Sequence, residues 1–198
     1  MMRRVLIAIT ALAVMISGHG CIFEPRKAQQ PGQGGEDLWI VPNAPKDVFL
    51  NLASGLTSKN NSNYTRSLDP NFTFTPRPED VGLVPSGALD NWTQQVEIDF
   101  LTRLKGDYPK ERFIQFGDEN GSFEKEYTDE LGKAVYEGSY VITLDPGDGT
   151  PKQTYSGIAR FTILQGTKGW ALTAWEDIDI NGNYSTSGYL RGTHRASG

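Results

Sequence analysis

The chain has 198 residues with a formal net charge of −5, and 37% of its residues are hydrophobic. That length suits one globular domain with a tether. An acidic chain without a basic stripe is a poor nucleic-acid binder, so we expect no nucleic-acid partner. A single cysteine excludes a disulfide framework, and the fold must therefore rest on its hydrophobic core.

The first twenty residues have the layout of a secretory leader. Arg3 and Arg4 form a basic start, and Val5 to Ile16 is an almost wholly apolar run. That run is shorter than the roughly twenty residues that a membrane-spanning helix needs. We therefore expect residues 1–20 to be a signal peptide that is removed on export.

Cys21 and its neighbours resemble the lipobox of bacterial lipoproteins. Gly20 is the small residue expected before the cysteine, although Gly18 stands where leucine is usual. The resemblance implies cleavage before Cys21 and acylation of the new N-terminus, with palmitate among the chains, so that the mature protein is anchored in the cell membrane or outer membrane and faces the periplasm or the surface. The alternative is an ordinary secretory signal with Cys21 as an incidental thiol.

The composition after the cysteine predicts three further segments. Residues 21–42 contain a stretch rich in Pro, Gly and Gln, which is typical of a flexible tether. Residues 43–180 carry the periodic patterns of a folded α+β domain. Residues 181–198 are small, polar and mildly basic, and we expect them to form a loosely ordered tail.

Helical patterns come first in the domain. Asn43 can cap a first helix, with Pro45 in its first turn. A short helix is predicted to carry Tyr64 and Leu68, and a third helix to begin at Asp90 or Asn91. The apolar positions that recur at helical spacing are Val48, Phe49, Leu52 and Leu56 in the first helix, and Trp92, Val96, Phe100, Leu101 and Leu104 in the third.

Strand patterns follow the helices. Phe72 and Phe74 alternate with threonines as a short strand. Later strands are predicted over residues 112–116, 122–127, 133–144, 153–164 and 170–178. Their connections are too short for crossover helices, which predicts antiparallel hairpins. Helices followed by such a meander favour an α+β layer fold.

This order of elements resembles the nuclear-transport-factor-2-like superfamily, which includes SnoaL-like, ketosteroid-isomerase-like and cystatin-like domains. The resemblance rests on the first helix, on the strand ending in Tyr155-Ser156-Gly157-Ile158-Ala159-Arg160-Phe161, and on the closing segment from Gly169 to Asp177. It implies helices packed on a strongly curved antiparallel sheet in a cone, and a homodimer formed through that sheet. Because the superfamily contains enzymes and non-enzymes, the fold does not decide the function.

The predicted domain contains no histidine, since His19 lies in the leader and His194 in the tail. This excludes Ser-His-Asp and Cys-His nucleophiles and histidine-based zinc sites. We expect no cofactor.

Carboxylate chemistry is the catalytic alternative. Trp170 and Leu172 are predicted to face inward, so Glu176 on the same face could sit at the mouth of the cone as a general acid or base, with Tyr140 as a hydrogen-bond donor. Without catalysis, the predicted cone-lining ligand-binding residues are Tyr136, Tyr140, Trp92 and Glu176.

Residues 177–182 match the first half of a calcium loop, with Asp177, Asp179 and Asn181 at ligand positions. The twelfth position is Gly188, where a glutamate is required. A strand followed by a turn at Asn181-Gly182 therefore explains this segment better than a metal site.

The sequence thus predicts a membrane-tethered lipoprotein of the cell envelope. Its domain is expected to bind a small apolar ligand in the cone or a protein on the sheet. An isomerase-type or dehydratase-type enzyme is the alternative.

Overall fold

The computed structural model describes residues 39–58, 61–182 and 185–195. The predicted signal peptide, Cys21 and most of the predicted tether lie outside these residues. Within the described part, none of the helices has the length and apolar character needed to cross a bilayer.

The first helix is α2, which spans Pro45–Thr57. Its predicted apolar stripe is confirmed, because all four stripe residues are buried. The predicted cap is wrong by one residue: Ala44, and not Asn43, stands at the N-cap. The backbone N–H of Ala44 donates to the carboxylate of Asp47 over 2.8 Å, and this bond holds the first turn.

Short elements connect α2 to the next long helix. They are α3 (Ser62–Arg66), strand β1 (Leu68–Thr75) and α4 (Pro78–Val81). Leu68 belongs to the strand and not to the short helix. Helix α4 lies within residues 76–87, where the Pro and Gly content predicts a loop, so that prediction is wrong for these four residues.

The long helix α5 spans Gln94–Asp107, so it begins later than predicted. Asn91 has a φ of 50°, a left-handed conformation that a helix cannot continue. Trp92 therefore lies in the connection before α5, where its buried ring packs against Phe74 and Phe100. Along α5, Phe100, Leu101 and Leu104 are buried as predicted.

The remaining strands are β2 (Glu111–Phe116), β3 (Lys125–Thr128), β4 (Lys133–Asp145), β5 (Gln153–Gly166) and β6 (Gly169–Ile180). They form one six-stranded sheet in the order β1-β6-β5-β4-β2, and β3 also pairs with β4. The predicted antiparallel meander is confirmed for β4, β5 and β6. Strand β1 closes the other edge by pairing with β6 in parallel.

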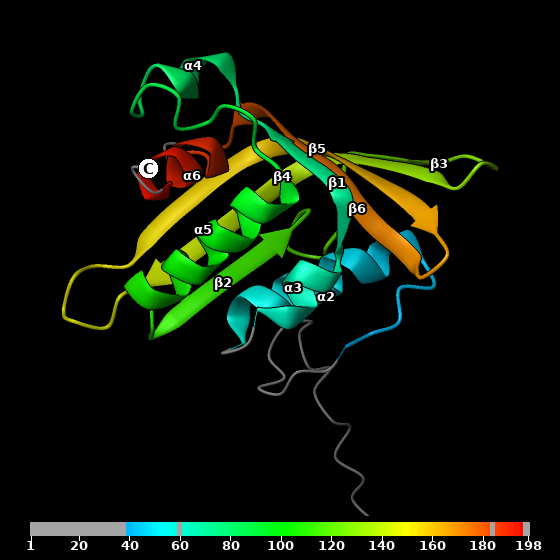
Figure 1. Cartoon of the computed structure of the whole chain (residues 1–198), viewed down its shortest axis with the longest axis horizontal. Coiled ribbons are helices and arrows are strands. Elements are labelled where there is room, and N and C mark those ends of the chain that lie inside the picture. The colour runs from blue at the N-terminus through cyan, green and yellow to red at the C-terminus, as the bar shows by residue number, and fades with distance from the viewer. Residues whose placement is uncertain (1–38, 59–60, 183–184, 196–198) are drawn as a thin grey trace, which may run out of the picture. The chain divides into compact units, whose positions relative to one another are not determined.

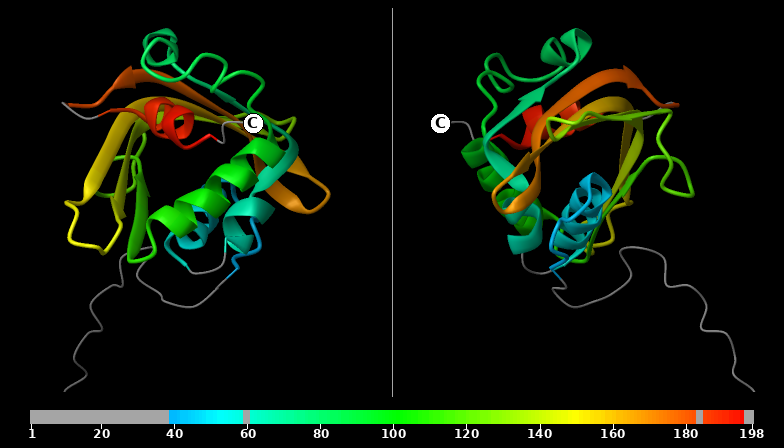
Figure 2. Two further views of the ribbon diagram at one scale, coloured as in Figure 1. Left: turned by 60° about the vertical axis from the view of Figure 1, so that its left-hand side comes forward. Right: turned by 90° about the vertical axis from the view of Figure 1, so that its right-hand side faces the viewer.

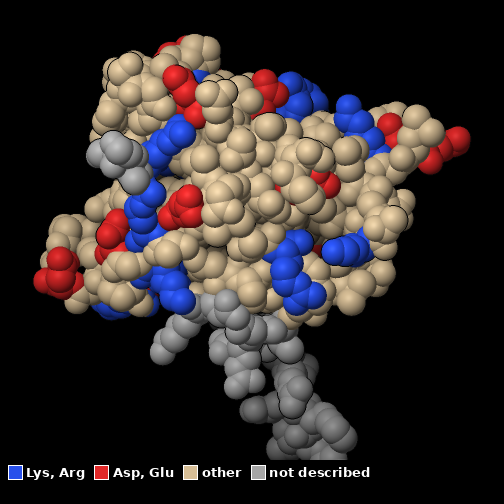
Figure 3. Space-filling model, in the orientation of Figure 1, with Lys and Arg blue, Asp and Glu red and all other residues tan. Residues whose placement is uncertain are grey.

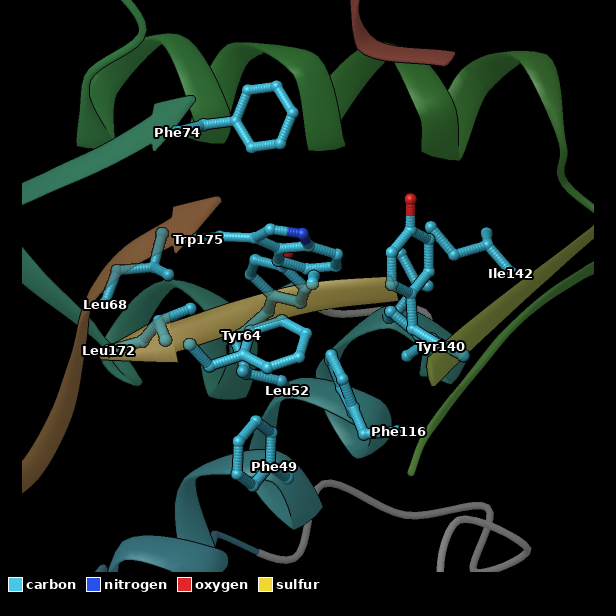
Figure 4. Packing of buried hydrophobic residues seen from close by; sticks show 14 of the residues in the cluster. Phe49, Leu52, Tyr64, Leu68, Phe74, Phe116, Tyr140, Ile142, Leu172 and Trp175 are labelled. Atoms are coloured by element: carbon cyan, nitrogen blue, oxygen red, sulfur yellow. The ribbon is translucent and has the colours of Figure 1, made fainter. Parts of the chain in front are cut away.

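The sheet curves strongly, and helix α2 lies within the curve (Figures 1 and 2). The core fills the space between the helices and the concave face of the sheet. Trp175 lies at its centre, with Phe74 on one side and Tyr140 on another (Figure 4). The predicted α+β class, with helices packed on a curved sheet, is confirmed.

The predicted loosely ordered tail is wrong for residues 185–195. Helix α6 spans Ser187–His194 and packs against α4, α5 and β5. Its Leu190 is fully buried and Arg191 is 1% exposed. Beyond the helix, Arg195 Nη1 donates to three backbone carbonyls of the segment before α5, those of Gly87, Ala88 and Asp90. The packed domain thus continues to the end of α6.

Candidate functional site

Glu176 does not face the interior of the cone, so its predicted inward placement is wrong. It is 44% exposed and accepts a hydrogen bond of 2.9 Å from Arg160 on the outer side of the sheet. Arg160 also contacts Glu137, so the three side chains form an ion-pair row across β4, β5 and β6. Solvent screens such exposed pairs, so Glu176 lacks the buried position that was predicted for a general acid or base.

A β-bulge is the reason for this change of face. Thr162 pairs with Ala174 while the next residue, Ile163, pairs with Leu172, so Thr173 is an extra residue in β6. One extra residue moves every later side chain to the opposite face. Trp170 and Leu172 point inward as predicted, but beyond the bulge the inward residues are Trp175 and Asp177.

A second bulge separates Asp177 and Asp179, two positions at which the sequence matches a calcium loop. Ile158 pairs with Asp179 and Ala159 with Asp177, which leaves Ile178 unpaired. Asp177 is buried, whereas the side chain of Asp179 is 65% exposed. Within the described ranges, no group of three or more His, Cys, Asp or Glu side chains could hold a metal ion.

The predicted ligand-binding aromatic residues all lie inside the core. Tyr136 packs against Phe49 and Phe123. Tyr140 is fully buried, and its hydroxyl accepts a 2.8 Å hydrogen bond from the backbone N–H of Ser187 at the start of α6. Trp92 is also buried. The structure therefore brings Tyr140 and Trp92 into the interior with α6 and leaves Glu176 outside.

The buried carboxylate that the sequence analysis missed is Glu97 on α5. It is 0% exposed and accepts hydrogen bonds from Tyr64 Oη (2.9 Å) and Trp92 Nε1 (2.7 Å). Two more come from Arg191, from Nε (2.9 Å) and Nη2 (2.7 Å). Four donor groups therefore satisfy both oxygens of this buried carboxylate.

Arg191 lies among aromatic rings. Its guanidinium carbon is 4.3 Å from the ring centre of Phe74, 4.4 Å from that of Trp175 and 5.5 Å from that of Phe100. Rings at these distances attract the cation through their π faces. We call the set of Glu97, Phe74, Trp175 and Phe100 the guanidinium cage.

The start of α6 is held by a second buried carboxylate, Asp177. It accepts hydrogen bonds from Ser187 Oγ, from the backbone N–H of Gly188 and from Trp175 Nε1, at 2.8–3.0 Å. Thr186 adds a hydrogen bond of 2.6 Å to Asp80 on α4. Helix α6 is therefore fixed at its start by two aspartates and along its length by Glu97.

Burial governs the titration of this interior. It raises the pKa of Tyr64 and Tyr140 well above the usual value, and the neighbouring carboxylates Glu97 and Asp177 raise it further. Burial also raises the pKa of Asp177, against the opposing effects of Arg191 and the hydrogen bonds. Neither tyrosine can serve as a base near neutral pH, because both stay protonated.

The space next to Arg191 is almost filled. A cavity of about 10 Å³ lies between α5, α6 and the sheet, and its lining includes Tyr64, Trp175 and Arg191. That volume is at the lower limit for a single water molecule. The described interior thus holds its own side chains in the place where a small apolar ligand was expected.

A sequence signal for Glu97 did exist. It stands three, four and seven positions before Phe100, Leu101 and Leu104, so it lies within the apolar stripe of the helix. A charged residue within such a stripe indicates a buried, paired group. The sequence gave a weaker indication that Arg191 is buried. The eight residues of α6 contain only one large aliphatic side chain, so they show no apolar stripe in which a charged residue would stand out.

Comparison with known proteins supports the fold alone. No protein family and no curated protein matches the sequence significantly. A solved structure from Novosphingobium aromaticivorans, named provisionally as an aromatic ring hydroxylase, is similar with a TM-score of 0.53 and 14% identity, over 69% of this chain and 86% of that one. A conserved protein from Planctomyces limnophilus is similar with a TM-score of 0.51 and 12% identity, over 68% and 94% of the two chains.

A third similar structure has a lower TM-score. It is an NTF2-like protein from Anabaena variabilis, with a TM-score of 0.43 and 14% identity, over 71% of this chain and 90% of that one. The structures from Novosphingobium aromaticivorans and Planctomyces limnophilus, with TM-scores above 0.5, support the α+β fold with helices packed on a curved sheet. Identities this low say nothing about activity.

Proposed function

We propose that the protein is an exported lipoprotein, anchored through Cys21, whose domain is a non-catalytic binding module. The partner that we propose is a second copy of the same domain, which contacts the outer side of the sheet. The observation that carries this proposal is the small size of the cavity in the described core. A cavity of about 10 Å³ is far below the roughly 300–1,000 Å³ of ligand pockets.

The anchor part of the proposal is supported by the sequence. A leader of the right length ends in small residues before the only cysteine of the chain. Copies held on one membrane surface meet at a raised effective concentration, so even a weak contact between domains would be populated.

The outer sheet face supports the proposed contact. We define it by ten residues that are partly or fully exposed: Val135, Glu137, Ser139, Val141 and Thr143 on β4, Ile158, Arg160 and Thr162 on β5, and Ala174 and Glu176 on β6. Most of these side chains are short, which lets a second sheet approach to about 10 Å. A two-fold contact needs only that this one face be self-complementary.

Surface charge does not single out another partner. On the face shown in Figure 3, basic and acidic side chains are interspersed among uncharged ones. The enzyme alternative lacks geometric support, because Glu176 and Tyr140 lie on opposite sides of the sheet.

The anchor is tested by intact-mass measurement on protein purified from bacterial membranes. We expect a mature species that begins at Cys21 and carries acyl chains, and a Cys21→Ser variant that lacks them. Unmodified protein in the soluble fraction would contradict the anchor.

The contact is tested by sedimentation of the detergent-solubilised protein. We expect a dimer that Thr162→Arg converts to a monomer, because an arginine on the outer sheet face adds bulk and charge to the interface. The matched control is Thr102→Arg on the exposed side of α5, which should remain a dimer. If the wild-type protein were a monomer at all concentrations, a second copy would not be the partner. If the Thr162→Arg variant were still a dimer, the interface would lie outside the outer sheet face.

A further inference from the structure

Arg191 fills a site that the rest of the domain builds. We propose that the guanidinium cage is a receptor site for a guanidinium cation and that the C-terminal helix fills it with the chain's own arginine. The ligand class is a guanidino group, carried either by the arginine of a second copy or by a free guanidino compound. This inference depends neither on the lipid anchor nor on the outer sheet face.

The carboxylate of the cage is held in place without help from α6. Tyr64 on α3 and Trp92 before α5 each donate a hydrogen bond to one oxygen of Glu97. The two oxygens thereby present their remaining lone pairs toward the space that Arg191 occupies. Such positioning by neighbouring groups lowers the cost of binding, because the site is already ordered.

The chemistry of the cage selects a guanidinium over an ammonium. Arg191 donates through Nε and Nη2 to the two different oxygens of Glu97, which is the bidentate arrangement that a planar guanidinium allows. Phe74 and Trp175 approach the same cation within 4.5 Å. A lysine ammonium offers a point charge without this planar fork and is more strongly hydrated.

The chain's own arginine does not satisfy the site completely. Across the described residues, Arg191 Nη1 has no hydrogen-bond partner although it is buried. The cavity of about 10 Å³ is lined in part by this same residue. An unpaired buried donor beside an unfilled space is a cost that another guanidino ligand, with a substituent or a water at that position, would relieve.

The element that carries Arg191 is suited to exchange. Helix α6 has eight residues with Gly188 and Gly192 among them, and a helix this short is marginal without tertiary contacts. Its attachment therefore depends on Glu97 and Asp177, and not on its own helical stability. The site and its present occupant lie on different elements, the cage on β1, α5 and β6 and Arg191 on α6.

The test empties the site in the full-length protein with Arg191→Ala and refills it with methylguanidinium. The probe is used at low millimolar concentration, far below the molar range in which guanidinium unfolds proteins. We expect a saturable rise in melting temperature of roughly 3–5 °C once the probe is tenfold above its Kd. Methylammonium chloride at equal concentration is the ionic control and should have little effect.

The double variant Glu97→Gln/Arg191→Ala is the matched control, because it keeps the space and removes the carboxylate. It should not respond to methylguanidinium, and neither should the wild type, whose site is filled. An unresponsive Arg191→Ala variant, or an equal response in the double variant, would overturn the proposal. If Arg191→Ala does not fold alone, it is refolded in the presence of each salt. Recovery of folded protein with methylguanidinium but not with methylammonium would support the site. No recovery with either salt overturns it.

A second arm distinguishes the two sources of the guanidino group. Full-length Arg191→Ala, with an intact cage, is mixed with full-length Glu97→Gln, which retains its arginine. Both chains also carry Thr162→Arg, which removes the proposed contact through the outer sheet face. A heterodimer that still forms in native mass spectrometry would show that α6 exchanges between copies. Rescue by methylguanidinium without a heterodimer in this background would assign the site to free guanidino compounds.

Discussion

Glu97 and Arg191 meet in two hydrogen bonds of 2.7 and 2.9 Å, although 94 positions separate them in the chain. The exposure of the two side chains is 0% and 2%. A buried charge without its partner is strongly destabilising, so this contact couples the folding of the C-terminal segment to that of the main body. The last helix is therefore part of the folding unit despite its short length.

Removing the cation of this pair should be costly. We expect Arg191→Met to lower the free energy of unfolding by about 3–5 kcal/mol, because Glu97 is left buried without its counter-charge. Urea denaturation monitored by tryptophan fluorescence measures the change. The double variant Glu97→Gln/Arg191→Met should recover part of the loss, since no uncompensated charge remains. A double variant no more stable than Arg191→Met would contradict this account.

The hydroxyl of Tyr140 should contribute through its contact with α6. In Tyr140→Phe the buried backbone N–H of Ser187 loses its acceptor, which costs about 1–3 kcal/mol. Tyr127→Phe, at a tyrosine that is 61% exposed, is the matched control and should change stability by less than about 0.5 kcal/mol. The melting temperatures of the two variants are compared. Equal decreases in melting temperature would contradict a stabilising role of the Tyr140 hydroxyl.

Gly157 makes room for that hydroxyl. A Cβ at this position would lie 2.5 Å from Tyr140 Oη and 2.9 Å from the carbonyl oxygen of Asp179. We expect Gly157→Ala to cost about 1–3 kcal/mol through overpacking. In the double variant Gly157→Ala/Tyr140→Phe the cost should be less than the sum of the single changes, because the closest contact is gone. Strict additivity in a double-mutant cycle would show that the two residues do not interact.

Much of this fold was predictable from the sequence because its long elements are strongly periodic. Tyr136 and Tyr140 on β4 were predicted to line the cone and Leu52 to lie in the apolar stripe of α2, and all three are buried. These elements bury one face against one core, so pattern and structure agree. The order of elements was then enough to indicate the curved-sheet architecture.

The candidate site was harder to predict because it depends on irregular and tertiary features. Alternation along β6 placed Glu176 inside, but the unpaired Thr173 reverses the faces, and alternation does not reveal a bulge. Helix α6 has little apolar character, and its burial follows from the ion pair of Arg191 with a distant glutamate. Local patterns carry no information on such a pairing.

The reversed faces of β6 predict opposite outcomes for two adjacent acidic residues. Glu176→Ala should change stability by about 0–1 kcal/mol, because it removes one exposed ion pair with Arg160. Asp177→Ala should cost more than about 2 kcal/mol, since it leaves several buried donors of α6 and Trp175 without their acceptor. Chemical denaturation of the two variants tests the bulge in β6. If Glu176→Ala lowered the free energy of unfolding as much as Asp177→Ala or more, the pairing register of β6 with β5 would be wrong.

The pH dependence of stability should carry the signature of Asp177. Burial raises the pKa of its carboxyl in the folded protein above the ordinary value of about 3.9. The folded state then holds the proton more tightly than the unfolded chain. The contribution of Asp177 to the free energy of unfolding is therefore fully present below the pKa of the unfolded state and is lost as pH rises through the pKa of the folded state. We expect wild type to gain stability relative to Asp177→Asn as pH falls from about 7 toward 4.

Asp118 provides a control of the opposite sign. It lies in an exposed turn, where backbone N–H groups of Ser122 and Asn120 lower its pKa. Its contribution is present above the unfolded pKa and is lost as pH falls through the lower folded pKa. In urea titrations at a series of pH values, wild type should therefore lose stability relative to Asp118→Asn as pH falls below about 4, whereas its gain relative to Asp177→Asn develops above that pH. Parallel curves of unfolding free energy against pH for wild type and Asp177→Asn would mean that Asp177 has the same pKa in the folded and unfolded chain. The hydrogen bonds to its carboxylate would then offset the effect of burial on its pKa.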